Sequence, residues 1–121
     1  MSEIFYTHSR IDVNDDRVMR THLQGYINAN YDYLVLQFGE PDKNNLDDYK
    51  IDASWAIRFS DGEVATIYNW KNGVNYLGEN LGKDVKDIVE WHIGGRNPNV
   101  VERIKLIMSL GERSENLRTD V

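Results

Sequence analysis

The clearest pattern in the chain is an alternation of apolar and polar residues from Tyr49 to Phe59. Every odd-numbered position in these eleven residues is apolar, and the even-numbered positions carry Lys, Asp, Ser, Ala and Arg. Such a period of two is typical of a strand with one buried face. The turn sequence Ser60-Asp61-Gly62 then predicts that residues 63–71 return as the second strand of a hairpin.

The register of this hairpin decides which aromatic side chains are buried. A two-residue turn would place Tyr68 and Trp70 on the buried face. A three-residue turn that ends in a bulge at Gly62 would bury Ala65 and Ile67 instead and leave the aromatic pair on the opposite face. The Ser-Asp-Gly sequence favours the three-residue turn.

Two helices are predicted on either side of the hairpin. Apolar residues three and four positions apart predict a short helix over residues 31–38, which Gly39 and Pro41 bring to an end. A C-terminal helix is predicted over residues 98–111, with Asn97 as its N-cap.

Two more strands are predicted at residues 23–27 and 88–93, the second ended by Gly94-Gly95, and residues 71–87 form a long loop. The fold is therefore α+β: a small antiparallel sheet of three to four strands, with a short N-terminal helix and a C-terminal helix packed on one face. The chain divides into an N-terminal arm (1–20), a single domain (21–111) and a polar C-terminal tail (112–121). The apolar residues of the arm favour docking on the domain or on a neighbouring subunit.

Composition and charge exclude several classes of function. The chain has 121 residues, with 14 Lys and Arg against 20 Asp and Glu, which gives a net charge of −6. This balance disfavours long nucleic acids and membrane surfaces as partners, because both favour clustered Lys and Arg. The absence of Cys excludes disulfides and thiolate metal sites and suits the cytoplasm. No stretch of about 18 apolar residues is present, and the N-terminus does not resemble a signal peptide.

The sequence offers no clear catalytic centre. No Ser lies in a Gly-x-Ser-x-Gly motif, and none of the three His has the spacing of a His-based metal site. Glu90 and His92 share one face of a predicted strand and are the candidates for a small metal-dependent hydrolase, although a polar cross-strand pair is favoured. Asp47, Asp48 and Asp52 could hold a metal, but a solvated loop is favoured. We therefore expect no catalytic residues, no cofactor and no metal.

Residues 92–98 have the composition of an anion site. Gly94 and Gly95 allow backbone amides to approach a ligand, and Arg96 adds a fork of donors. Asn97 precedes a helix whose N-terminus carries partial positive charge. Together with His92, these residues are the candidate site for a small anion or phosphate. The favoured interpretation, however, is that the glycines only turn the chain and that Arg96 is solvated.

A second candidate site is aromatic. Tyr68, Trp70 and Tyr76 lie in or after the hairpin, with Lys71 and Asn72 among them. Amphipathic rings beside amide side chains are typical of a recognition surface for a protein or a base. For each single ring, burial in the core or self-association is the favoured interpretation, whereas recognition is favoured for at least one solvent-facing ring of the group. The acidic loop residues Asp47 and Asp48 are added to this partner-binding set because an acidic surface could imitate nucleic acid.

A helix, a Gly-x-Pro sequence and a hairpin follow one another in the chain. The residues of this motif are Tyr31, Leu34, Phe38, Gly39 and Pro41, then Trp55, Ile57, Phe59, Asp61, Gly62 and Val64. The motif resembles a unit of small outer-membrane-assembly lipoproteins and beta-lactamase-inhibitor-like repeats. The resemblance covers about a third of the chain and implies local architecture only.

Three runs of residues carry a second resemblance. They are Asp48-Tyr49-Lys50-x-Asp52-Ala53-x-Trp55-x-Ile57-x-Phe59, Val64-Ala65-Thr66-Ile67-Tyr68-Asn69-Trp70-Lys71 and Glu90-Trp91-His92-Ile93-Gly94-Gly95. With these runs, a larger part of the chain, residues 23–95, resembles small uncharacterised proteins of tailed bacteriophages. This resemblance implies a soluble protein made in an infected bacterial cell, where small accessory phage proteins often inhibit host enzymes or defence systems. It supplies no catalytic residues.

Three functions are therefore considered. The leading hypothesis is a non-enzymatic, phage-encoded protein that binds and inhibits a host defence or nucleic-acid-handling protein. The first alternative is a sponge that sequesters a small nucleotide signal, and the second is a small metal-dependent hydrolase. A homo-oligomer is also considered, because a small sheet leaves an edge that a neighbouring chain can extend.

Overall fold

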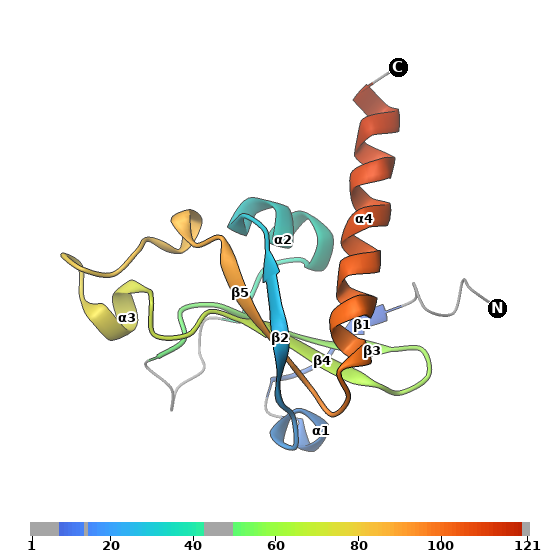
Figure 1. Ribbon diagram of the computed structural model, residues 1–121, viewed down its shortest axis with the longest axis horizontal. Helices are drawn as coiled ribbons and strands as arrows, with labels where there is room; N and C mark the ends of the chain where they lie inside the picture. The colour runs from blue at the N-terminus through green and yellow to red at the C-terminus, as the bar shows by residue number, and fades with distance from the viewer. Residues whose placement is uncertain (1–7, 14, 43–49, 120–121) are drawn as a thin grey trace.

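The computed structural model describes residues 8–13, 15–42 and 50–119, with side chains as far as residue 109, and its sheet has five antiparallel strands in the order β1-β3-β4-β5-β2 (Figure 1). The strands are β1 (His8–Arg10), β2 (His22–Asn28), β3 (Ser54–Phe59), β4 (Val64–Tyr68) and β5 (Glu90–Gly95). The helices are α1 (Asp16–Met19), α2 (Tyr31–Phe38), α3 (Val74–Leu77), α4 (Asn99–Thr119) and the 3-10 helix η2 (Val85–Asp87). The α+β class is confirmed, with five strands rather than three to four.

The hairpin of β3 and β4 has the three-residue turn. The Phe59 amide donates to the Glu63 carbonyl over 2.8 Å, and Gly62 has a φ of +94°, which favours glycine. Ala65 and Ile67 are consequently fully buried, as the preferred register predicts. Tyr68 lies on the opposite face of the sheet.

The core lies on one face of the sheet, beneath α2 and α4 (Figure 1). Trp55 and Trp91 are fully buried at its centre, with their ring centroids 5.4 Å apart in an edge-to-face arrangement. The N–H of each indole makes a hydrogen bond. Trp55 Nε1 donates to the Gly39 carbonyl over 2.7 Å, and Trp91 Nε1 donates to the Ala29 carbonyl over 2.9 Å. Both acceptors flank α2, so the two tryptophans hold this helix on the sheet.

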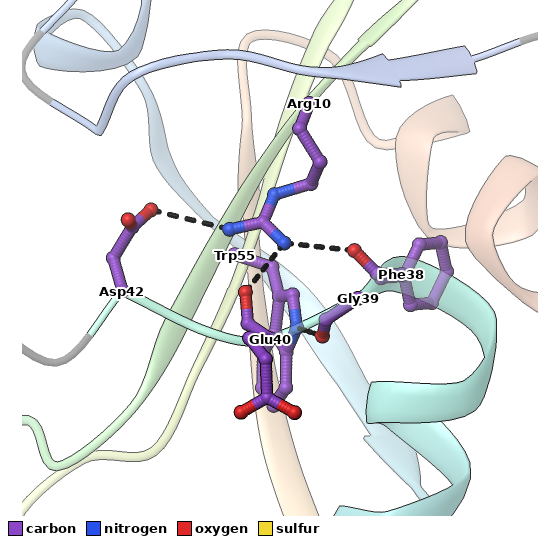
Figure 2. Close-up of polar contacts among 6 residues, drawn as sticks. All are labelled: Arg10, Phe38, Gly39, Glu40, Asp42 and Trp55. Atoms are coloured by element: carbon purple, nitrogen blue, oxygen red, sulfur yellow. Dashed lines mark hydrogen bonds and ion pairs between the residues drawn. The ribbon is translucent and has the colours of Figure 1, made fainter.

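Arg10 of β1 ties the edge of the sheet to the end of α2 (Figure 2). Its Nη1 donates to the carbonyls of Phe38 and Glu40, both over 2.7 Å, and its Nη2 donates to Asp42 over 3.3 Å. A guanidinium suits this position because the last carbonyls of a helix lack partners and carry partial negative charge. Residues 8–10 of the predicted arm are thus an integral strand of the sheet.

Several element boundaries differ from the sequence predictions. β3 begins at Ser54 rather than near residue 49, β4 ends at Tyr68 rather than at residue 71, and β5 begins at Glu90 rather than at residue 88. β5 continues through Gly94 and Gly95, because both residues pair with β2 on one side and with β4 on the other. The predicted loop 71–87 contains α3, η2 and a bridge from Gly73 to Lys83. The C-terminal helix runs through Gly111 to Thr119, since a lone glycine costs a helix only about 1 kcal/mol and no proline follows it.

An ion pair links α4 to the hairpin turn and gives a pH-dependent prediction. Arg103, which is buried, donates to both carboxylate oxygens of Asp61, over 3.0 and 2.6 Å. This pairing lowers the pKa of Asp61 from 3.8 to about 2. Because the folded-state pKa lies below the unfolded value, the stabilisation is complete above pH 3.8 and is lost as the pH falls towards 2.

We expect Asp61→Asn to remove this part of the acid sensitivity. The Asp61 side chain is 47% exposed, so solvent screening reduces the contribution to about 1 kcal/mol. Urea unfolding at pH 6 and at pH 3 measures it: the loss of stability between the two pH values should be smaller in Asp61→Asn than in the wild type. Asp87→Asn, which removes an exposed carboxylate in η2, is the control and should keep the wild-type difference. Equal pH slopes in all three proteins would contradict the prediction.

Candidate functional site

A row of four rings crosses the face of the sheet that α2 and α4 leave uncovered, which we call the open face. Tyr26 of β2 pairs in register with His92 of β5, and His92 pairs with Tyr68 of β4. Their ring centroids are 4.8 and 5.4 Å apart, and Tyr68 is 6.2 Å from Trp70. All three contacts are edge-to-face. We call these four residues the aromatic row.

The aromatic row is partly accessible and uncharged at its centre. Tyr26 is 50% exposed, and Tyr68, Trp70 and His92 are half-buried. Burial lowers the pKa of His92 below its usual value, and the nearby Glu90 carboxylate opposes this shift. His92 is therefore a neutral ring at pH 7, and the row offers apolar ring surfaces with polar tips.

A pocket of about 300 Å³ lies between the aromatic row and the segment that contains α1. In Figure 1, α1 lies on the side of the sheet opposite α2 and α4. The lining residues are Val13, Val18, Thr21, His22, Leu23, Ile51, Ser54, Trp55, Thr66, Tyr68, Trp70 and Gly94. This mixture of aliphatic residues, aromatic residues and a few hydroxyls is typical of a small-molecule site.

The pocket contains two buried hydroxyl side chains from adjacent strands. Ser54 and Thr66 are only 4% and 8% exposed. The Oγ of Ser54 has no hydrogen-bond partner among the described residues, although most buried hydroxyls are paired. A Cβ at Gly94 would lie 2.5 Å from Thr66 Oγ1, so this glycine leaves the space that the hydroxyl occupies.

Two lysines lie beside the Trp70 end of the aromatic row. The Nζ of Lys50 is 5.4 Å from the Trp70 ring centroid, and the Nζ of Lys71 is 5.9 Å from it. Lys71 Nζ also lies 5.6 Å from the ring of Tyr76. These distances are those of cation–π contacts, which hold both ammonium groups next to the rings. Two ammonium groups therefore lie beside Trp70, although neither lysine lines the pocket.

A network of amide side chains fixes the backbone around Trp70. The Oδ1 of buried Asn69 accepts from the amides of Asp52 and Ala53, over 2.7 and 3.1 Å. Its Nδ2 donates to the carboxylate of Asp52 and to the side chain of Asn72, over 2.9 and 3.1 Å. Asp52 and Asn72 thus serve to hold the end of the hairpin. The sequence suggested the carboxylate of Asp52 as a metal ligand, but this carboxylate instead accepts a hydrogen bond from Asn69 within the network.

The residues of the predicted anion site are not gathered around one ligand position. Gly95 packs against Val100 in the core, whereas Gly94 lines the pocket on the other face. Arg96 is exposed and shares a hollow of about 260 Å³ with Asp61 and Glu63, whose carboxylates disfavour an anion there.

The predicted N-cap is wrong. Asn97 Nδ2 donates to the Glu63 carboxylate over 3.0 Å, and α4 begins two residues later at Asn99. The helix N-terminus and Asn97 are therefore not arranged as the sequence suggested.

Of the predicted partner-binding residues, Tyr68, Trp70 and Lys71 gather at one end of the open face. Tyr76 shares Lys71 with Trp70 but does not line the pocket. Asp47 and Asp48 lie outside the described residues. Within the ranges that the structure describes, no three His, Asp or Glu side chains are placed to hold a metal ion, and the pair of Glu90 and His92 gains no third ligand there.

Sequence reasoning missed Tyr26, Ser54 and Thr66. The alternation in β3 and β4 already places Ser54 and Thr66 on the face away from the core. The place of Tyr26 in the aromatic row, however, depends on the pairing of β2 with β5, two strands that are far apart in the chain.

No protein-family model and no curated protein matches this chain. In the part of the chain with a described structure, no helix has both the length and the apolar content needed to cross a bilayer. The function must therefore be argued from the open face itself.

Proposed function

We propose that this chain is a non-enzymatic binding protein that holds a small planar ligand on the open face of its sheet. The observation that carries the proposal is the pocket of about 300 Å³ with Trp70 and Tyr68 in its wall. Flat rings bind well against such walls because stacking and burial of apolar surface both contribute. Of the hypotheses considered from the sequence, sequestration of a small nucleotide signal fits this arrangement best, with the ligand in the pocket instead of at Arg96.

The proposal is tested by a thermal-shift panel of nucleobases, nucleosides, linear nucleotides and cyclic nucleotides. We expect at least one compound to raise the unfolding temperature of the full chain, and Trp70→Leu to abolish that rise. Tyr76→Leu is the matched control, because Tyr76 is an aromatic neighbour that contacts Lys71 without lining the pocket. The proposal fails if no compound stabilises the wild type, or if Trp70→Leu responds as the wild type does.

A protein target is the second candidate, and the exposure of Tyr26 favours it. Tyr26 is 50% exposed at the β2 end of the aromatic row and does not line the pocket, so a small ligand there would leave its ring uncovered. Exposed tyrosines are common anchors of protein interfaces. In that case the chain would be the phage-encoded inhibitor of a host protein, acting in the cytoplasm of an infected cell. Stabilisation by indole, a model of a tryptophan side chain, without stabilisation by any nucleobase would favour this candidate.

A further inference from the structure

Strand β2 forms an edge of the sheet and lacks most of the features by which proteins protect such edges. Within the described ranges it pairs with β5 alone. With seven residues it is the longest of the described strands, whereas natural edge strands are commonly short. It contains no Pro and no Lys, Arg, Asp or Glu, which are the residues that discourage a second chain from pairing. Its one protective feature is a bulge between Leu23 and Gly25, so residues 25–28 are the regular part of this edge.

One hydrogen bond shows which backbone groups of β2 point outward. The Ala29 amide donates to the Val89 carbonyl over 2.8 Å, so these two residues form a hydrogen-bonded pair. In an antiparallel ladder such pairs alternate with pairs whose N–H and C=O groups point away from each other. The backbone groups of Tyr26 and Asn28 therefore point away from β5, and a further antiparallel strand could pair with them.

The surface along this edge is accessible. Tyr26 and Asn28 are exposed, and Ile27 is the buried residue of the strand. A hollow of about 250 Å³ lies beside these three residues, between β2 and α4. Side chains of an added strand would find space to pack there.

Charge favours a second copy of this chain as the source of the added strand. Each copy carries a net charge of −6, so two copies repel each other unless they meet on uncharged surface. Residues 21–31 are the longest stretch of the sequence without Lys, Arg, Asp or Glu, and β2 lies within it. The β2 strands of two copies therefore meet without opposing like charges.

We infer that two copies of this chain pair antiparallel through β2 about a two-fold axis, which joins their sheets into one. In such a ladder outward-directed residues face each other, so Tyr26 lies opposite Tyr26 or Asn28 of the second copy. The aromatic row of one copy then continues into that of the other. This inference goes beyond the proposed function and is independent of it, because Tyr26 and Asn28 do not line the pocket.

The first experiment is analytical ultracentrifugation of the full chain over a series of concentrations. We expect reversible formation of a dimer that strengthens as salt screens the repulsion between the two acidic chains. Tyr26→Lys should weaken the dimer at least about tenfold, because a charge on an edge strand opposes pairing. Ser9→Lys is the matched control: it adds the same charge to an exposed position of β1, at the opposite edge, and should dimerise as the wild type does.

Two results of this experiment would overturn the inference. One is equal weakening of the dimer by Tyr26→Lys and Ser9→Lys. The other is a wild-type chain that stays monomeric throughout, which would leave the edge to an extended segment of another protein. Circular dichroism of each variant establishes that a loss of the dimer is not a loss of the fold.

The second experiment tests whether the backbone of β2 makes the contact. Asn28→Pro removes an N–H that points to the open edge, where proline is tolerated, so the pairing with β5 should persist while the dimer weakens. Hydrogen exchange of the wild type needs no variant: the amides of Tyr26 and Asn28 should exchange more slowly in the dimer than in the monomer. The amide of Ser9 should exchange equally in both. A dimer in which the Tyr26 and Asn28 amides exchange as they do in the monomer overturns the inference.

Discussion

Asn69→Leu should destabilise the protein by about 3 kcal/mol. Leucine has a similar shape but can neither accept from the amides of Asp52 and Ala53 nor donate to Asp52 and Asn72. Because Asn69 is fully buried, water cannot replace these partners. Removing one partner from a buried hydrogen-bonded set leaves the others unsatisfied, and this penalty exceeds the modest net value of each bond.

Urea unfolding followed by tryptophan fluorescence measures this effect. With an m-value of about 1.5 kcal/mol/M, the midpoint should fall by about 2 M. Asn75→Ala is the control, since it removes a single exposed hydrogen bond to the Ile51 carbonyl and should cost less than about 1 kcal/mol. A midpoint shift in Asn69→Leu as small as that of the control would show that the amide network does not hold the hairpin end.

Gly95→Ala and Val100→Ala should each lower the free energy of unfolding by about 2 kcal/mol. The double variant should lose at least about 1 kcal/mol less than the sum of the two single losses. A Cβ at Gly95 would lie 2.6 Å from Val100 Cγ2, closer than packed carbon atoms approach. Val100→Ala alone leaves a cavity under α4. In the double variant the new methyl group occupies that cavity, so the two defects partly cancel.

The measurement is a double-mutant cycle by urea unfolding. Gly95 is a strand residue without a positive φ, so alanine strains no backbone there and the cost comes from packing. Gly95→Ala combined with Ile107→Val is the control cycle, because residue 107 lies about two helical turns beyond residue 100 and its effect should add. Additive costs for the Gly95 and Val100 pair would mean that α4 shifts away from the sheet as a whole.

Local sequence patterns predicted the elements of the fold that depend mainly on neighbouring residues: a strand, a hairpin turn and a short helix. The period of two in residues 49–59 predicted β3, which occupies only the last six of those residues. The Ser-Asp-Gly turn predicted its register with β4, because turn chemistry and a buried face together allow one pairing. Helix α2 has the predicted bounds, since Asn30 caps its start and Gly39, with a φ of +86°, ends it.

The sequence predicted only the part of the candidate site that comes from a single hairpin. Tyr68, Trp70 and Lys71 are close in sequence, so a single hairpin was enough to place them together. The predicted site at residues 94–98 did not assemble, because strand alternation sends Gly94 to the open face and Gly95 to the core. Adjacent residues of one strand face opposite sides of the sheet, so they cannot both contact the same ligand while both remain paired with neighbouring strands.

The sequence by itself determined the strands whose apolar residues alternate, the helix α2 and the hairpin register. It also determined that Tyr68 and Trp70 lie on the open face. Only the tertiary structure decided that Tyr26 and His92 extend this pair into a row, and that α1 and Ser54 enclose a pocket beside it. The physical reason is that a strand pattern specifies which face a side chain takes but not which strand lies beside it. Strand order depends on packing of the whole core around Trp55 and Trp91, and no local pattern contains that information.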